Sequence, residues 1–156
     1  MNSQLCEAWR IHDRINRYVV ERIVDEDWGI PMSKTKGVGA QFAHIVNVRR
    51  MWVSAADTAV EPTFEKLDEK AASRAEVLTA LDQSGDAILA LVEAALREGR
   101  SVKNFKPSAE AFVGYLISHE SAHRAMAELA LRQAGRPLPD KVAYGQWEWG
   151  SRAKEL

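Results

Sequence analysis

The sequence has little of what would mark a secreted or membrane-bound protein. Its 156 residues include a single cysteine, Cys6, so no internal disulfide can form, as is usual for proteins of a reducing compartment. No apolar stretch is long enough to span a bilayer, and the first ten residues lack the apolar core of a signal peptide. We therefore expect a cytoplasmic protein without membrane contact.

A surplus of charge of one sign is also missing. The chain has 21 lysines and arginines against 22 acidic residues, a net charge of −1, and no long run of either kind. Nucleic-acid-binding proteins usually carry a basic patch or stripe, so we expect no nucleic-acid partner. The length favours one domain over residues 1–156, large enough to bury roughly two-thirds of its unfolded surface without help from a metal. Any metal site is therefore expected to be functional.

Helical periodicity is present in most of the chain, and no run alternates as a half-buried strand would. Apolar residues recur at steps of three and four positions in four segments. These lie at about residues 5–23, 37–57, 73–98 and 108–134. A long polar loop is expected over 58–72. Four long helices with three connections predict an all-α fold, a four-helix bundle.

Local signals mark the predicted helix ends. Ser73 and Glu76 have the spacing of a capping box, in which each side chain accepts from the other's backbone N–H. Ser108 is a typical N-cap, and Gly135 followed by Pro137 is a typical stop signal. The tail tryptophans, Trp147 and Trp149, are expected to pack into the core, with a cover over the open end of the bundle or a partner surface as the alternatives.

Two histidines, His119 and His123, lie four residues apart on the apolar stripe of the last predicted helix. Residues at this spacing share one helix face, so both imidazoles can reach one metal ion. Two separate, hydrogen-bonded core histidines are the alternative, but two inward histidines are harder to satisfy without a shared partner. A third ligand could be His44 or His12, and periodicity does not choose between them.

The same segment also matches a zinc-peptidase pattern. His119-Glu120-Ser121-Ala122-His123 reads His-Glu-x-x-His, in which two histidines bind zinc and the glutamate is the general base. One form of this site takes a glutamate from a later helix as the third ligand, and Glu148 is a nominal candidate. The small size of the chain and its lack of strands favour a bundle instead.

Four stretches together resemble the DinB/YfiT-like family. They read QFAHIVNVR at 41–49, FVGYLISHESAHR at 112–124, LRQAGRPLP at 131–139 and YGQWEW at 144–149. The resemblance spans nearly the whole chain and implies a four-helix bundle with one divalent metal. By position, it assigns the metal ligands to His44, His119 and His123. Many relatives have a further histidine just before the last ligand, where this chain has Ala122.

The resemblance also implies a function. Relatives include transferases and isomerases that use low-molecular-weight thiols, so a metal-dependent transferase or hydrolase of a small-molecule substrate is expected, with such a thiol as cosubstrate. Zinc or nickel suits imidazole ligands best, with iron or manganese as alternatives. A homodimer is expected from the family. A metal-dependent binding or stress-response protein without catalysis is the remaining alternative.

Four further residues are candidates for a role at this site. His12 and Asn16 are expected to line the same cavity from the first helix, where they would contact substrate or orient a ligand. Arg124 is expected to hold an anionic substrate group at the pocket mouth, although a solvated helix face is the plainer interpretation. Glu120 and His12 are the candidate catalytic residues.

Overall fold

The computed structural model describes residues 4–56 and 62–156, and these residues are helical for most of their length. The helices are α1 (Gln4–Val20), α2 (Asp25–Trp28), α3 (Val38–Ala56), α4 (Arg74–Arg97), α5 (Ala109–Gln133), α6 (Asp140–Gly145) and α7 (Trp149–Ala153). Within the described ranges there is no strand, only an isolated bridge between Met32 and Thr35. The prediction of an all-α fold is confirmed.

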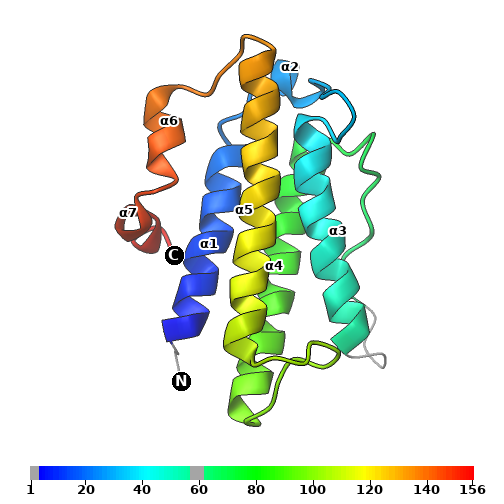
Figure 1. Ribbon diagram of the computed structural model, residues 1–156, viewed down its shortest axis with the longest axis vertical. Coiled ribbons are helices and arrows are strands. Elements are labelled where there is room, and N and C mark those ends of the chain that lie inside the picture. The colour runs from blue at the N-terminus through cyan, green and yellow to red at the C-terminus, as the bar shows by residue number, and fades with distance from the viewer. Residues whose placement is uncertain (1–3, 57–61) are drawn as a thin grey trace.

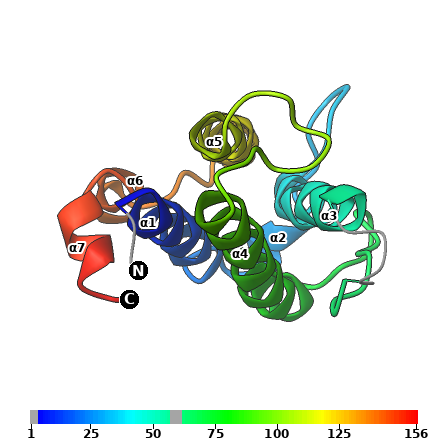
Figure 2. The ribbon, with the colours of Figure 1, turned by 90° about the horizontal axis from the view of Figure 1, so that it is seen from below.

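The four long helices α1, α3, α4 and α5 pack side by side (Figures 1 and 2). Helices α4 and α5 each contact both α1 and α3. Seen along the bundle, α5 lies between α1 and α3 on one side, and α4 lies between them on the other (Figure 2). Different faces of α5 therefore meet α1 and α3. The neighbours of each α5 residue in the candidate site depend on which of these faces it occupies.

The predicted helix ends are largely confirmed. The side chain of Ser73 accepts from the Glu76 amide, and Glu76 accepts from the Ser73 amide, so the capping box is present. Ser108 caps α5, and Gly135 just beyond it has a φ of 72°, a backbone conformation that glycine adopts without strain. The predicted last residue of the second helix, Asp57, lies outside the described residues, as do residues 58–61 of the expected loop.

Two parts of the chain differ from expectation. Helix α1 ends at Val20, so Ile23 is buried from a turn rather than from the helix. The tail forms the short helices α6 and α7, and α7 packs against α1. The expected core packing of the tail tryptophans is wrong, because Trp147 is 75% exposed and Trp149 is 37% exposed.

The core is apolar but contains an unusual set of polar side chains. All four long helices contribute fully buried apolar residues, among them Trp9, Phe42, Leu81 and Phe112. The polar side chains with no exposed surface are His12, Asn16, Arg49, Ser84 and Glu120. Across the part of the chain that the structure describes, no helix is both long and apolar enough to cross a membrane.

Candidate metal centre

Three histidines from two helices come together at one point. His44 of α3 and the pair His119 and His123 of α5 can each offer one ring nitrogen such that the three atoms lie within 4.8 Å of one another. The Nε2 atoms of His119 and His123 are 3.1 Å apart. Two nitrogens that each lie about 2.0–2.1 Å from one zinc ion are separated by roughly 3 Å, so this spacing fits a shared metal.

Two of these rings are oriented by hydrogen bonds that leave Nε2 available. The Nδ1–H of His44 donates to Glu69 Oε1 at 2.8 Å, and the Nδ1–H of His123 donates to Gln41 Oε1 at 2.6 Å. An acceptor on Nδ1 places the proton there, so the Nε2 lone pair can bind a metal. The buried Nδ1 of His119 has no hydrogen-bond partner among the described residues.

The histidine cluster disfavours protonated imidazoles. Burial and the neighbouring His119 and His44 lower the pKa of His123 to about 4. Burial and His44 also lower the pKa of His119. Because a metal binds the neutral ring, an environment that keeps imidazoles neutral is suited to a cation site.

Glu69 completes this environment from the loop before α4. Burial alone would raise the pKa of its carboxyl, but hydrogen bonds from Lys36, His44 and Asn47 outweigh burial and lower the pKa to about 2. The Lys36 Nζ lies 2.7 Å from Glu69 Oε2. Glu69 is therefore a carboxylate that holds the ring of His44 in place.

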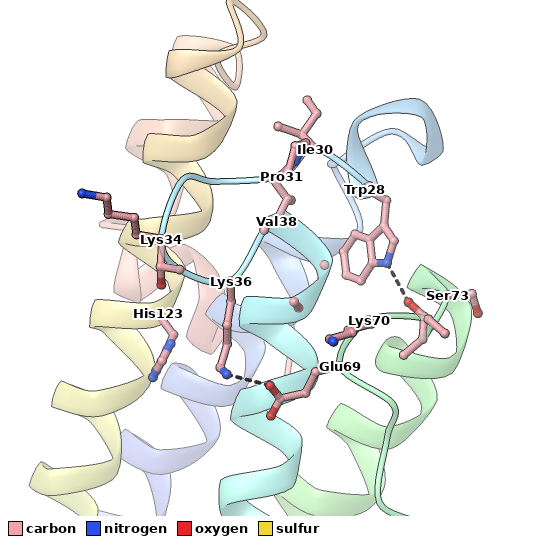
Figure 3. Close-up of a pocket in the computed structure, with 17 residues that line it drawn as sticks. Trp28, Ile30, Pro31, Lys34, Lys36, Val38, Glu69, Lys70, Ser73 and His123 are labelled. Carbon is pink, nitrogen blue, oxygen red and sulfur yellow. Dashed lines mark hydrogen bonds and ion pairs between the residues drawn. The ribbon is translucent and has the colours of Figure 1, made fainter.

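A groove of about 890 Å³ adjoins the cluster (Figure 3). His123 and Glu69 are the members of the metal centre that line it. The rest of its wall comes from the 28–40 segment and from residues 70–73 before α4. The groove is large enough for a small molecule that reaches the edge of the histidine cluster.

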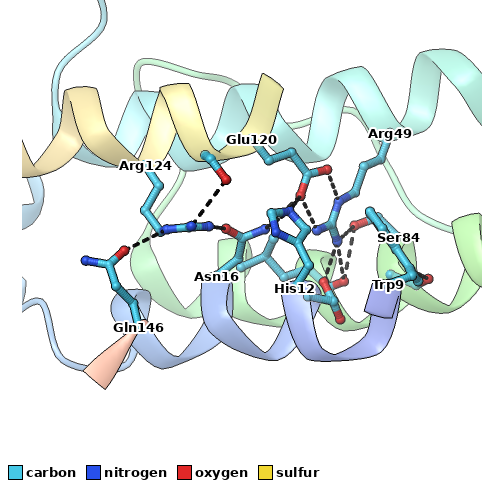
Figure 4. Close-up of polar contacts among 12 residues, drawn as sticks. Trp9, His12, Asn16, Arg49, Ser84, Glu120, Arg124 and Gln146 are labelled. Atoms are coloured by element: carbon cyan, nitrogen blue, oxygen red, sulfur yellow. Dashed lines mark hydrogen bonds and ion pairs between the residues drawn. The ribbon is translucent and has the colours of Figure 1, made fainter. Parts of the chain in front are cut away.

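Glu120, although adjacent to His119, belongs to a different set of contacts (Figure 4). Its Oε1 accepts from Arg49 Nε at 2.8 Å, and its Oε2 accepts from Arg49 Nη2 at 2.7 Å. His12 Nε2 and Asn16 Nδ2 also donate to Oε2, at 2.8 and 2.7 Å. Burial would raise the pKa of Glu120, but Arg49 and His12 outweigh it and the pKa is lowered. Glu120 is thus a fully buried, fully bonded carboxylate.

The buried hydrogen-bond network around Glu120 also contains the predicted pocket residues His12, Asn16 and Arg124. Arg124 donates from Nη1 to Asn16 Oδ1 at 2.6 Å and from Nε to Gln146 Oε1 at 2.9 Å (Figure 4). None of the three lines the groove beside His123. The structure therefore brings the three metal-ligand candidates together but places the substrate-contact candidates elsewhere. Successive residues of a helix point about 100° apart, so His119 and Glu120 face different surroundings.

This arrangement gives the peptidase interpretation no support. Its general base would be Glu120, whose carboxylate has no exposed surface and is held by Arg49, His12 and Asn16. Its third ligand would be Glu148, which is exposed at the start of α7. The third metal-ligand candidate beside the pair is His44 instead.

Sequence reasoning missed the residues that orient the ligands. Gln41 precedes His44 by three positions on α3, so a shared helix face was a usable signal for it. Glu69 and Lys36 come from segments without helical periodicity. No local pattern predicts that Glu69 meets His44 or that Lys36 meets Glu69.

A comparison with protein families finds a match over nearly the whole chain. The family model described as DinB family matches residues 1–152. No curated protein and no solved structure matches the chain. The match covers nearly all of the 156 residues, and it includes every residue of the cluster and of the buried network. The chain belongs to the DinB family.

Proposed function

We propose that this protein binds one divalent metal ion through His44, His119 and His123 and uses it to act on a small molecule as a transferase or hydrolase. The observation that carries the proposal is the convergence of three ring nitrogens within 4.8 Å. The orienting hydrogen bonds of His44 and His123 support it, because metal-binding histidines usually donate their other N–H to a carboxylate or carbonyl.

Three imidazoles without a fourth protein ligand are typical of catalytic rather than closed structural metal sites. Zinc or nickel is the proposed ion, since both suit imidazole, with iron or manganese as the alternatives. A divalent ion held there supplies Lewis acidity, which lowers the pKa of a water or thiol or polarises a carbonyl. We propose a low-molecular-weight thiol as the cosubstrate, and the groove beside His123 has room for such a molecule.

The metal assignment is tested by two alanine variants. His44→Ala should lose most of its metal, whereas Glu148→Ala should bind metal as the wild type does. Loss of a ligand should weaken binding by more than the roughly ten- to hundredfold effect of removing an orienting partner. Metal titration of dialysed protein measures both, and circular dichroism checks that both variants are folded. If His44→Ala keeps wild-type affinity, the assignment is wrong.

Catalysis is tested separately from binding. The metal-loaded protein is screened with low-molecular-weight thiols and electrophilic small molecules for thiol-dependent transfer, and with esters and amides for hydrolysis. Turnover by the wild type that disappears in His44→Ala supports a metal-dependent catalytic function. Saturable ligand binding without turnover in any reaction would instead support a metal-dependent binding protein.

A further inference from the structure

The groove beside the histidine cluster carries a surplus of positive charge. Three lysines line it, Lys34 and Lys36 from the 28–40 segment and Lys70 from the loop before α4 (Figure 3). Glu69 is the only acidic side chain among its lining residues. Two lysine charges therefore remain uncompensated within the groove, before any charge that a metal would add.

The lysines differ in what they already bind. Lys36 is committed to Glu69 at 2.7 Å. For Lys34 and Lys70, the described residues include no acidic partner of the side chain, and both are exposed. Lys36 thus supports the metal centre, whereas Lys34 and Lys70 have ammonium groups available for an anion that enters the groove.

Lys34 lies at a backbone position that ordinarily favours glycine. Its φ is 62°, one of only two positive values among the described non-glycine residues. The turn that contains it is closed by the bridge between Met32 and Thr35. Strained backbone of this kind is often found at binding sites. A lysine in this turn places a cation beside the groove that a glycine would not supply.

One wall of the groove, at Trp28, is apolar and fixed. The Trp28 ring is held by a 2.9 Å hydrogen bond from Nε1 to the Ala72 carbonyl and stacks on Phe42 with centroids 6.0 Å apart. Ile30 and Pro31 continue this wall (Figure 3). A molecule in the groove therefore meets an apolar surface as well as the lysine ammonium groups.

We propose that the groove selects a small organic anion, with its apolar body against Trp28, Ile30 and Pro31 and its carboxylate or phosphate at Lys34 or Lys70, which line different sides of the groove (Figure 3). This inference rests on the proposed metal function, because the reacting end of the molecule is the one that reaches the histidine cluster past His123. The substrate class proposed for that centre is therefore a small organic anion.

The test uses two thiols that differ only at the far end, 6-mercaptohexanoate and 6-mercaptohexanol. Protein loaded with Co²⁺ is titrated with each, and the thiolate-to-cobalt charge-transfer band reports binding, since a coordinating thiol is deprotonated. The wild type should bind the acid roughly tenfold more tightly than the alcohol, and added salt should reduce this preference. 6-Phosphonohexane-1-thiol, the phosphonate analogue, shows whether a carboxylate or a phosphate-like group is preferred.

Lysine variants assign the preference to the groove. In the double variant Lys34→Gln/Lys70→Gln the acid should bind no more tightly than the alcohol, while alcohol affinity and cobalt occupancy stay at wild-type values. Lys106→Gln is the matched control, because it removes an equal charge from an exposed lysine between α4 and α5, outside the groove. It should keep the full preference for the acid.

The outcomes separate the two proposals. Equal affinity for acid and alcohol in the wild type, or an undiminished preference in the double variant, overturns the anion-selective groove and leaves the metal centre intact. Cobalt binding without a thiolate band from any probe also overturns the groove, since it then gives no path to the metal. Failure to bind cobalt overturns the proposed function and this inference with it.

Discussion

Arg49 and Glu120 form a two-point ion pair in the middle of the bundle, with neither side chain more than 1% exposed. Nε and Nη2 of Arg49 donate to separate oxygens of Glu120 at 2.8 and 2.7 Å. Arg49 also donates from Nη1 to Asp13 Oδ1 at 2.7 Å, so the pair joins α3 and α5 to α1. Glu120 directly follows His119, and this pair therefore fixes the helix that carries two of the three metal-ligand candidates.

Glu120→Ala should destabilise the protein by about 3–5 kcal/mol, because it leaves the Arg49 guanidinium buried without its main acceptor. Asp86→Ala, which removes an exposed carboxylate from α4, should change stability by no more than about 0.5 kcal/mol. Urea unfolding followed by circular dichroism measures both. Wild-type stability of Glu120→Ala would show that the ion pair does not hold the bundle together.

Removal of the metal should leave the fold intact, since the core of the four long helices is built from buried apolar residues and not from the three candidate ligands. Chelator should leave the helical signal unchanged and the unfolding transition cooperative. The melting temperature should fall only by the amount expected when a ligand that stabilises the folded state by binding is removed. A loss of helicity on chelation would mean that the metal is structural, and the argument for a catalytic site would lose its basis.

Glu69→Gln should weaken metal binding by roughly ten- to hundredfold without unfolding the protein, because the ring of His44 loses its charged acceptor. Glu65→Gln is a suitable control, since it removes an exposed carboxylate from the same loop. Metal titration by calorimetry gives both affinities. Equal affinity in the two variants would show that Glu69 does not orient His44 for metal binding.

Ser73→Ala should cost about 1 kcal/mol of stability, because the Glu76 amide at the start of α4 loses its acceptor. Ser118→Ala, at an exposed position inside α5, should be neutral or slightly stabilising, since alanine is the better helix former. The comparison of their urea midpoints isolates the capping box from the general effect of removing a serine hydroxyl. Similar midpoints for the two variants would contradict the assigned cap.

The helices and most of their ends could be predicted because the rules that govern them act within one or two turns. Ser73, Ser108 and Gly135 mark ends that the structure places within a residue of the prediction. The spacing of His119 and His123 likewise fixes that they share one face of α5, whatever packs against it. The short helices of the tail were missed, since five or six residues give too little periodicity to detect.

The choice between His12 and His44 shows where local rules stop. Both lie on helices that contact α5, and the residues alone left either as the third ligand. The resemblance to the family pointed to His44, and the packing brings it to the pair, while His12 meets Glu120. Which partner each histidine meets depends on which face of α5 its helix packs against.

By itself, then, the sequence determined an all-helical chain, its caps and a histidine pair on one helix face, because those features depend on neighbours within a few residues. The tertiary structure alone decided that Glu69 holds His44, that Arg49 holds Glu120, and that three lysines line the groove that reaches His123. Each of these relationships joins residues from different segments, and only the packing of α1, α3, α4 and α5 brings such segments together.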